Sequence, residues 1–371
     1  MIKVSVVGAS GYSGMYLMYA LSLRHDVSIS FITSQSFFGK KLSEIFPLFT
    51  NSGHKKNPLS NVQFSSFNAD DIALSSDIIF FCLPHGESSK LISDITKKNS
   101  KTKIIDIGAD YRFDDLKTYE EFYGKNNSSN ELNSEFNYGL CDIFYDKIKN
   151  SRFVSNPGCY PTGALLPTLP LIFKDAVDFN NPVIIDSLSG ISGRGRGVKL
   201  SNIFCEVENS VNAYSVWTHR HLPEIKEKIV GAFLSGGNLS DDLQRDPALP
   251  NIIFTPHVIP VVRGILTTIY LKIKGDISEN DIFNIYDDFY SGGPFVSILK
   301  NIEDCSIKNV IYSNNCHIAF EIGKNENERM IKIVSAIDNL GKGASLQAMQ
   351  NMNLMFDLEP DFGIPEYSPF P

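Results

Sequence analysis

The chain opens with Met1-Ile-Lys-Val-Ser-Val-Val7, continues through Gly8-Ala-Ser-Gly-Tyr-Ser-Gly14 and runs into Tyr16-Leu-Met-Tyr-Ala-Leu-Ser-Leu23. The first segment is apolar and β-branched, which favours a strand, and the third has the pattern of a helix. A strand, a glycine turn and a helix in this order are the context of a dinucleotide-binding loop. The glycine spacing is GxxGxxG and not GxGxxG, so an ordinary tight turn stays open as an alternative.

The next strand candidate, Val27–Thr33, ends without the acidic residue that usually holds the ribose 2′-hydroxyl of NAD. The chain instead has Thr33-Ser-Gln-Ser36 at this point, with Lys40 and Lys41 soon after. Hydroxyl groups and cations suit a 2′-phosphate, so we predict NADP in preference to NAD.

Further strand candidates follow in the first half of the chain, at residues 77–83, 103–107 and 153–155. Because strands alternate with helices, we expect a parallel sheet, which binds ligands at the carboxyl ends of its strands. The loops Pro84-His85-Gly86 and Gly108–Arg112 would lie at those ends.

The second half has a different pattern, which predicts an α+β domain with a mixed or antiparallel sheet. The final helix, expected over 343–355, has an amphipathic pattern whose Met and Leu residues should pack in the core. The strand candidates of this half are residues 181–188, 251–255, 266–273, 316–321 and 330–335.

Composition limits the classes of function. A chain of 371 residues is long enough for two domains, and its net charge of −8 argues against a nucleic acid or an anionic membrane as partner. No apolar run approaches the roughly 18 residues of a transmembrane helix, and the start of the chain lacks the pattern of a signal peptide. The six cysteines are scattered without CxxC spacing, which fits neither a zinc site nor a disulfide scaffold. We therefore expect a cytoplasmic protein.

One cysteine lies in a context that suits chemistry, within Ser155-Asn-Pro-Gly-Cys-Tyr-Pro-Thr162. The Pro-Gly pair predicts a tight turn between a strand and a helix, so Cys159 should lie near a helix N-terminus. The N–H groups there favour a thiolate and can bind an oxyanion, as covalent acyl chemistry requires. The alternative is a small buried cysteine beside a turn.

A candidate base lies in Thr218-His-Arg-His-Leu-Pro-Glu-Ile225. His219 and His221 would share one face if this segment is extended, and His221 would meet Glu224 if a helix begins there. A cysteine nucleophile needs a base and a group that orients it, and a His–Glu pair meets that need. A metal site and two structural histidines are the alternatives.

Two further loops carry arginines that could bind anions. The segment 187–197 is rich in glycine and contains Arg194 and Arg196, and the segment 254–266 contains His257 and Arg263. We expect Arg194 to be a solvated surface charge.

Taken together, these motifs resemble the N-acetyl-γ-glutamyl-phosphate reductase family over almost the whole chain. Arg194 departs from the family pattern, which usually has a small residue there. The matching motifs are residues 8–14, 106–112, 138–140, 156–162, 189–193 with Arg196, 204–207, 218–225, 254–257, 263–266 and 338–340.

The resemblance implies an α/β fold, with a Rossmann-type dinucleotide-binding domain and an α+β catalytic and dimerisation domain of the semialdehyde dehydrogenase type. The expected boundaries are 1–158 with 338–371 for the NADP domain and 159–337 for the catalytic domain. The implied assembly is a homo-oligomer, a dimer or a tetramer.

The implied reaction is the NADPH-dependent reduction of a small-molecule acyl phosphate, N-acetyl-γ-glutamyl phosphate, in arginine biosynthesis. The Cys159 thiolate would form a thioester, which hydride would reduce to N-acetyl-L-glutamate 5-semialdehyde. His219 and the Cys159 N–H would hold the oxyanion, and His221 with Glu224 would manage the cysteine proton.

The predicted site residues fall into three groups, and no metal is expected. The catalytic residues are Cys159, His219, His221 and Glu224. The cofactor-binding residues are Gly8, Ser10, Gly11, Tyr12, Ser13, Gly14, Thr33, Ser34, Ser36, Pro84, His85 and Asn339. The substrate-binding residues are Arg112, Ser189, Arg196 and Arg263.

Three alternatives stay open. Aspartate-semialdehyde dehydrogenase shares the general design but lacks the His-Arg-His-x-Pro-Glu motif. The related reductase of the carrier-protein lysine pathway would favour a basic face for docking its carrier protein. The net charge of −8 argues against this alternative. The third alternative is a catalytically silent NADP-binding regulator. Such a protein would not need the four predicted catalytic residues, so their presence argues against it.

Overall fold

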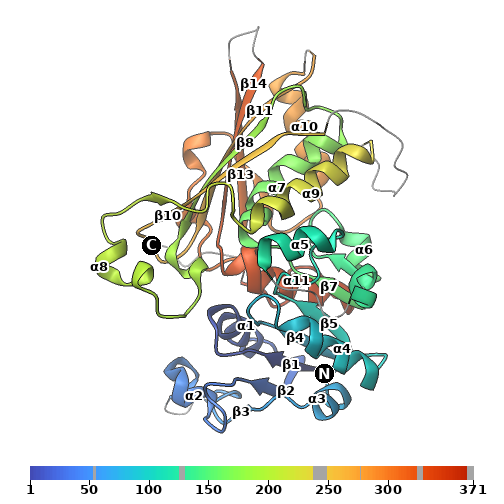
Figure 1. The fold of residues 1–371 in the computed structure, drawn as a ribbon, viewed down its shortest axis with the longest axis vertical. Helices are drawn as coiled ribbons and strands as arrows, with labels where there is room; N and C mark the ends of the chain where they lie inside the picture. Colours follow the sequence, from blue (N-terminus) through green and yellow to red (C-terminus); the bar gives the residue numbers. More distant parts are fainter. Residues whose placement is uncertain (53–55, 125–129, 237–248, 276, 324–328, 366–371) are drawn as a thin grey trace. The chain divides into compact units, whose positions relative to one another are not determined.

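The computed structural model describes residues 1–52, 56–124, 130–236, 249–275, 277–323 and 329–365 (Figure 1). The chain forms two compact units, Met1–Pro157 with Ala344–Pro365 and Gly158–Gly343. Residues 338–343 therefore group with the second unit, whereas we expected them in the first. The final residues of the expected first domain, 366–371, lie outside the described part.

The first unit contains a seven-stranded sheet in the order β3-β2-β1-β4-β5-β7-β6, and the printed strand pairs are all parallel. The strand order reverses between β1 and β4, which is the position where doubly wound sheets bind ligands. The predicted parallel α/β fold is confirmed. The strands are β1 (Ile2–Val7), β2 (Val27–Thr33), β3 (Phe64–Ser65), β4 (Ile78–Phe81), β5 (Lys103–Asp106), β6 (Phe136–Tyr138) and β7 (Phe153–Ser155).

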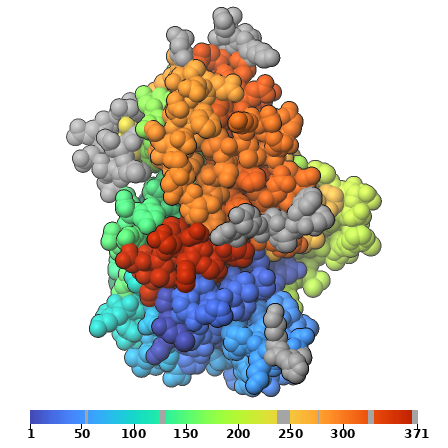
Figure 2. All heavy atoms as spheres, turned by 180° about the vertical axis from the view of Figure 1, so that it is seen from behind, coloured from blue at the N-terminus to red at the C-terminus, as the bar shows by residue number. Residues whose placement is uncertain are grey.

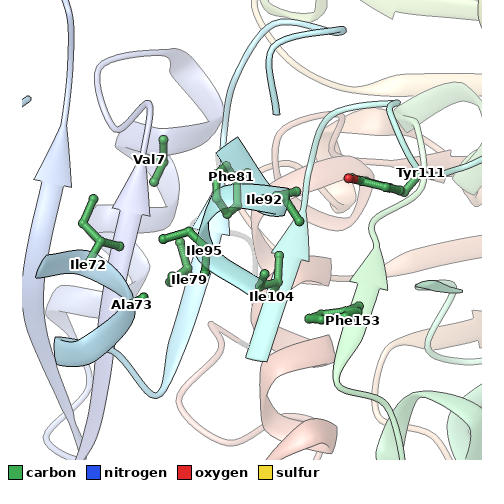
Figure 3. Close-up of a cluster of buried hydrophobic side chains, with 10 residues drawn as sticks. All are labelled: Val7, Ile72, Ala73, Ile79, Phe81, Ile92, Ile95, Ile104, Tyr111 and Phe153. Atoms are coloured by element: carbon green, nitrogen blue, oxygen red, sulfur yellow. The ribbon is translucent and has the colours of Figure 1, made fainter. Parts of the chain in front are cut away.

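Apolar side chains of the central strands and of two helices form a core on one side of this sheet (Figure 3). All four residues of β4 are buried, as expected for a parallel strand covered on both faces. The helices of the unit are α1 (Tyr12–Ser22), α2 (Leu42–Ile45), α3 (Ala69–Ser75), α4 (Ser88–Lys98), α5 (Leu116–Tyr123), α6 (Tyr145–Lys149) and α11 (Leu346–Met355).

The C-terminal helix α11 differs from its expected amphipathic form, because all ten of its residues are buried. Its polar side chains have partners inside the protein. Asn351 donates to the Gly139 carbonyl and to Asn156 Oδ1, and Asn353 donates to the carbonyls of Pro360 and Phe362. The predicted burial of its Met and Leu residues is confirmed.

The second unit contains a mixed seven-stranded sheet in the order β12-β13-β14-β11-β8-β10-β9. Its β8–β10 and β12–β13 pairs are parallel and the others are antiparallel, so the predicted mixed sheet is confirmed. The strands are β8 (Val183–Gly190), β9 (Asn212–Ala213), β10 (Ile252–Ile259), β11 (Ile265–Lys272), β12 (Val296–Ile298), β13 (Cys316–Ile322) and β14 (Met330–Ile337).

Burial alternates along β8, β10 and β11, so one face of this sheet is covered. The helix α7 (Cys159–Phe173) packs on β11 and β14 and on two other helices, α9 (His221–Leu234) and α10 (Glu279–Tyr290) (Figure 1). A fourth helix, α8 (Phe204–Val207), is a single short turn. None of the described helices has both the length and the apolar character needed to cross a membrane.

Helix α7 contains two internal prolines, Pro167 and Pro170, whose missing N–H groups leave the carbonyls of Gly163 and Leu166 without helical donors. Side chains from neighbouring elements supply these donors. Ser335 Oγ donates to the Gly163 carbonyl at 2.5 Å, and the Tyr290 hydroxyl donates to the Leu166 carbonyl at 2.5 Å. Tertiary hydrogen bonds thus maintain the helix that begins at Cys159.

Candidate active site

Cys159 is the first residue of α7, so the expected position near a helix N-terminus is confirmed. The preceding Gly158 is the N-cap and is extended, with φ −66° and ψ 155°. Gly343 packs directly against the cysteine, because a Cβ atom at Gly343 would lie 2.8 Å from Cys159 Cβ. The half-buried thiol thus lies at a helix end whose geometry is fixed by close packing.

Glu224, in the first turn of α9, is fully buried. Its Oε1 accepts a hydrogen bond from the backbone N–H of Gly158 at 2.9 Å. Burying a carboxylate is costly unless it is well paired, and a hydrogen bond to a charged group is stronger than a neutral one. Glu224 therefore holds the turn that presents Cys159.

The two histidines lie at the start of α9, which begins at His221, so the helical one of the two conformations that we considered is the one observed there. The segment before it is a turn and not extended, since the Leu222 N–H donates to the His219 carbonyl. The rings nevertheless come together, with centroids 5.1 Å apart.

One hydrogen bond defines the tautomer of His219. The backbone N–H of His221 donates to His219 Nδ1 at 3.1 Å, so Nδ1 is an acceptor and the ring proton lies on Nε2. Burial, and to a smaller extent the charge of Arg220, lowers the pKa of His219 to about 4. His219 is thus a neutral imidazole with an Nε2–H donor.

Aromatic rings account for this burial. Tyr160, Tyr214 and Phe254 each contact the His219 ring, with centroids 5.3 to 5.5 Å away. The hydroxyls of Tyr160 and Tyr214 are 3.0 Å apart, and Tyr160 donates to the His257 carbonyl at 3.1 Å. Burial raises the pKa of both tyrosines, so they stay neutral donors.

Sequence reasoning missed both tyrosines. Tyr160 follows the cysteine directly, and that adjacency was a usable signal. Tyr214 is 54 residues away from Tyr160, and no local pattern connects the two.

The predicted anion-binding arginines of the second unit differ in their surroundings. Arg263 forms a two-pronged ion pair with buried Asp338, with Nη2 at 2.7 Å and Nε at 3.2 Å from its oxygens. The guanidinium also lies 4.6 Å above the Tyr312 ring. Arg196 is exposed.

Arg194 is not the solvated surface charge that we expected. Its guanidinium lies 5.1 Å above the ring of Tyr214, and its Nη1 donates to the Ser201 carbonyl at 2.9 Å. A planar cation can stack on an aromatic face and donate at its edge at the same time, which explains the difference.

Ser189 and Asn339 contact the loops around these arginines. Ser189 is buried and its hydroxyl donates to the Gly190 carbonyl. Asn339 accepts from the Gly264 N–H at 2.8 Å and donates to Ser192 Oγ at 2.9 Å. The Asn339 contacts thus hold the glycine-rich loop in place.

In the first unit, the glycines after β1 have different functions in the backbone. Gly8 has a left-handed φ of 86°, and a Cβ there would lie 2.5 Å from the Cys82 carbonyl oxygen. A Cβ at Gly14 would lie 2.6 Å from the Gly8 carbonyl oxygen. Gly11 is the N-cap of α1 and would meet nothing closer than 3.9 Å. The loop thus packs tightly on the sheet but leaves space at the helix N-terminus, which fits a pyrophosphate.

The remaining residues of this loop are Ser10, Tyr12 and Ser13. Ser10 Oγ is 2.9 Å from Ser34 Oγ, and Tyr12 and Ser13 begin α1. Thr33 Oγ1 accepts from the Gly8 N–H at 3.2 Å. The buried hydroxyls of Thr33 and Ser34 therefore support the loop.

Ser36 and Lys40 are exposed beyond the end of β2, where a ribose phosphate would need donors. This exposure leaves both side chains available to the predicted 2′-phosphate, in contrast to the buried Thr33 and Ser34.

Buried carboxylates hold the loop after β4, which contains Pro84 and His85. Asp110 accepts from the N–H groups of Gly86, Ser88 and Ser89. Burial and the neighbouring Asp110 raise the pKa of Asp106.

Arg112 is buried in the same unit, where it spans the ends of two strands. Its Nε donates to the Asn156 carbonyl and its Nη2 to the Ile107 carbonyl, each at 2.8 Å. Among the described residues, no group of three or more His, Cys, Asp or Glu side chains could hold a metal ion.

Comparison with known proteins identifies the family. Residues 3–151 match the family model described as semialdehyde dehydrogenase, NAD binding domain, and residues 159–339 match semialdehyde dehydrogenase, dimerisation domain. An N-acetyl-gamma-glutamyl-phosphate reductase of Thermoanaerobacter pseudethanolicus is 39% identical over 97% of this chain and 96% of its own length. The enzyme of that name from Lachnoclostridium phytofermentans is 40% identical over the full length of both chains. The chain belongs to the N-acetyl-gamma-glutamyl-phosphate reductase family.

Solved structures of low sequence identity share the fold of this family member. Aspartate semialdehyde dehydrogenase from Candida albicans, solved with NADP, has a TM-score of 0.67 at 13% identity and covers 97% of this chain and 99% of its own. Aspartate semialdehyde dehydrogenase II from Vibrio cholerae has a TM-score of 0.65 at 13% identity, covering 96% and 98%. The predicted semialdehyde dehydrogenase fold is confirmed, and the first unit is a nicotinamide dinucleotide-binding fold.

Proposed function

We propose that this chain reduces N-acetyl-γ-glutamyl phosphate to N-acetyl-L-glutamate 5-semialdehyde and phosphate with NADPH, as a step of arginine biosynthesis. The observation that carries the proposal is Cys159 at the start of α7 in the same unit as neutral His219, within a chain of this family. A helix N-terminus favours the thiolate, and a neutral imidazole N–H can stabilise an oxyanion.

The reaction proceeds through a covalent acyl-enzyme. The Cys159 thiolate attacks the acyl carbon, a C–S bond forms, the C–O bond to phosphate breaks, and phosphate leaves with the electron pair. When bound, NADPH supplies the hydride that reduces the resulting thioester carbonyl. The hemithioacetal oxyanion then collapses, the C–S bond breaks, and the aldehyde and the thiolate are released.

His219 stabilises the oxyanion of both tetrahedral species through its Nε2–H, together with the Cys159 N–H. The first N–H groups of a helix make no intrahelical hydrogen bond, so they can serve this purpose. Tyr160, Tyr214 and Phe254 exclude water from the imidazole and keep it neutral.

His221 takes the cysteine proton in the free enzyme. Glu224 supports this step from the first turn of α9, and its bond to the Gly158 N–H fixes the position of the cysteine. Both residues thus act on Cys159, one on its proton and the other on its position.

Substrate anions are bound by Ser189 and Arg196, of which Arg196 is exposed on the glycine-rich loop. We assign a structural function to Arg112 and Arg263, because their guanidinium groups bind backbone carbonyls and Asp338, respectively. Asn339 supports its loop through its bonds with the Gly264 N–H and with Ser192 Oγ.

The cofactor is NADP, held by the loop Gly8–Gly14 and by Ser36 at the end of β2. The loop that contains Pro84 and His85 follows β4 at the carboxyl end of the sheet and would contribute to holding the cofactor. The active protein is a cytoplasmic homo-oligomer.

The test is the reverse reaction with purified protein. N-acetyl-L-glutamate 5-semialdehyde and NADP⁺ should give NADPH in a phosphate-dependent manner, and Cys159→Ser should abolish turnover but leave NADPH binding intact. Aspartate semialdehyde serves as the control substrate. Equal or faster turnover of aspartate semialdehyde would favour the alternative dehydrogenase.

A further inference from the structure

A buried carboxylate closes the loop that follows β4. Asp110 Oδ1 accepts from the Gly86 N–H at 2.6 Å, and its Oδ2 accepts from the N–H groups of Ser88 and Ser89 at 3.1 and 3.0 Å. Gly86 has a left-handed φ of 79°, which glycine adopts without strain, so the loop can turn its donors toward one side chain. Because Asp110 is buried, it fixes the loop from inside the first unit.

Helix α5 holds both Asp110 and the loop. The hydroxyl of the fully buried Tyr119 donates to Asp110 Oδ1 at 2.9 Å. Burial and the charge of Asp110 raise the pKa of Tyr119, so the phenol stays a neutral donor. Tyr123 stacks on the Tyr119 ring at 4.9 Å and meets the His85 ring edge to face at 5.1 Å. Helix α5 therefore holds the loop 84–86 at two points, through a hydroxyl on its carboxylate and through a ring on its histidine.

The loop lies where this sheet can bind a dinucleotide. The strand order reverses between β1 and β4, so right-handed connections place α1 and α4 on opposite faces of the sheet. Helix α1 packs with α11, and Figure 2 shows the C-terminal segment (red) against the N-terminal one (blue). Helix α4 packs with α3 in the core of Figure 3. A Cβ at Gly8 would lie 2.9 Å from Leu83 Cδ2, so the loops after β1 and β4 are in contact.

The two helices at this position differ at their N-termini. Gly11 caps α1 without a side-chain acceptor, and the first turn of α1 contains no acidic residue. At α4 the Asp110 carboxylate accepts from the first N–H groups. A helix N-terminus attracts an anion, and a carboxylate already bound there repels a second one, so the pyrophosphate belongs at α1. In the strand order β2-β1-β4, the proposed 2′-phosphate site at β2 and the pyrophosphate at β1 leave the nicotinamide half for the loop after β4.

We propose that Tyr119 is a positioning residue for the nicotinamide half of the cofactor, acting through Asp110 on the loop 84–86. The inference rests on the cofactor site of the proposed function. Without the Tyr119 hydroxyl, Asp110 keeps its backbone donors but loses the bond that ties it to α5. Cofactor binding would then have to order the loop, which lowers the affinity.

The experiment measures NADPH affinity by titration calorimetry for the wild type, Tyr119→Phe and the matched control Tyr111→Phe. Tyr111 is also buried, and its hydroxyl donates to the Ser89 carbonyl of α4 at 3.2 Å. Each variant loses one buried hydroxyl bond near the start of α4, but only Tyr119→Phe separates Asp110 from α5. Asp110 itself stays unchanged, because an amide there would point donors at the N–H groups.

Tyr119→Phe should raise the Kd for NADPH about tenfold, since a hydrogen bond to a charged group contributes on the order of one power of ten, and Tyr111→Phe should raise it less than about twofold. A fragment of the cofactor separates a local effect from a loosened unit. Adenosine 2′,5′-bisphosphate lacks the nicotinamide half, so its Kd should be the same for all three proteins. Tyr123→Leu, which removes the ring contact with His85, should also weaken NADPH and leave the fragment unchanged.

Two results would overturn the inference. Equal NADPH affinities of Tyr119→Phe and Tyr111→Phe mean that the bond to Asp110 does not act on the cofactor. An equal loss of affinity for NADPH and for the fragment means that the variant loosens the whole unit. A wild type that binds NADH and not NADPH contradicts the proposed cofactor alone. The same comparison with NADH, and with adenosine monophosphate as the fragment, then decides the inference.

Discussion

At the scale of single residues, the chemistry of His219 follows from two neighbours. The His221 N–H occupies Nδ1, and the surrounding rings exclude water from the imidazole. Above its lowered pKa of about 4, this histidine carries no proton at Nδ1 and donates from Nε2 as a neutral imidazole. These properties suit an oxyanion donor better than a base.

We therefore expect His219→Ala to lower kcat with little change in KM, because only transition-state binding is lost. A single oxyanion donor contributes about 3 kcal/mol, so the loss should be on the order of 100-fold. The lowered pKa keeps the imidazole neutral, so the loss should be the same between about pH 5 and pH 8. Steady-state kinetics over this range measure it. A raised KM with unchanged kcat would show ground-state binding instead.

His221→Ala should fail differently, because His221 is assigned to the cysteine proton. Its loss should move the alkylation–pH profile of Cys159 upward, toward the value of about 8.5 of a free thiol. Iodoacetamide labelling of both histidine variants, with Cys159 identified by peptide mass, reads this titration. If His219→Ala moves the profile and His221→Ala does not, the two roles are reversed.

Ser36 tests the cofactor preference at the end of β2. Thr33 and Ser34 are buried against the glycine loop, so the exposed Ser36 is the better probe of the 2′-phosphate. Ser36→Glu should lower kcat/KM for NADPH and leave that for NADH equal or higher, because a carboxylate repels the phosphate and can accept from a 2′-hydroxyl. We expect the NADPH to NADH ratio to fall by at least about tenfold. A wild-type ratio near one would contradict the assignment.

At the scale of elements, helix α7 depends on hydrogen bonds from outside it. The Leu166 carbonyl lies opposite Pro170, which has no N–H, so the Tyr290 hydroxyl is its donor. The Pro167 carbonyl lies opposite the N–H of Leu171 and accepts from the Tyr286 hydroxyl as well. Tyr290→Phe leaves a buried carbonyl without a donor, at a cost of about 1–3 kcal/mol. Tyr286→Phe is the matched control and should cost less, since its acceptor keeps the helical bond. Urea unfolding of the two variants measures the difference, and equal costs would contradict this account of the helix.

The elements that the sequence predicts best are those with local signals. Helix α7 follows a Pro-Gly turn, α9 begins at the His-x-Pro-Glu motif, and β4 is an uninterrupted apolar run. Helix α11 shows the limit of this reasoning, because its asparagines are buried against partners up to 212 residues away. Hydrophobic periodicity cannot reveal a polar side chain whose hydrogen bonds come from distant backbone.

At the scale of the whole molecule, the sequence predicts two candidate sites but not the long-range contacts that shape them. Arg263 is 75 residues from Asp338, and the ion pair between them is the reason for the structural function that we propose for Arg263. The stack of Arg194 on the Tyr214 ring is a second contact that the local sequence does not reveal. From the sequence alone, Arg194 is interpreted as a solvated surface charge. The tertiary structure, and not the local pattern, decides which arginine can bind a substrate.

The central claim is that Cys159 carries the acyl group. Enzyme, semialdehyde and NADP⁺ mixed without phosphate should oxidise the Cys159 hemithioacetal once and then stop at the thioester. The measurement is rapid-mixing absorbance of NADPH, followed by acid quenching and peptide mass spectrometry. We predict a burst of about one NADPH per subunit, an N-acetylglutamyl group on Cys159, and turnover once phosphate is added. Phosphate-dependent turnover without a burst, or an acyl group on another residue, would contradict the account.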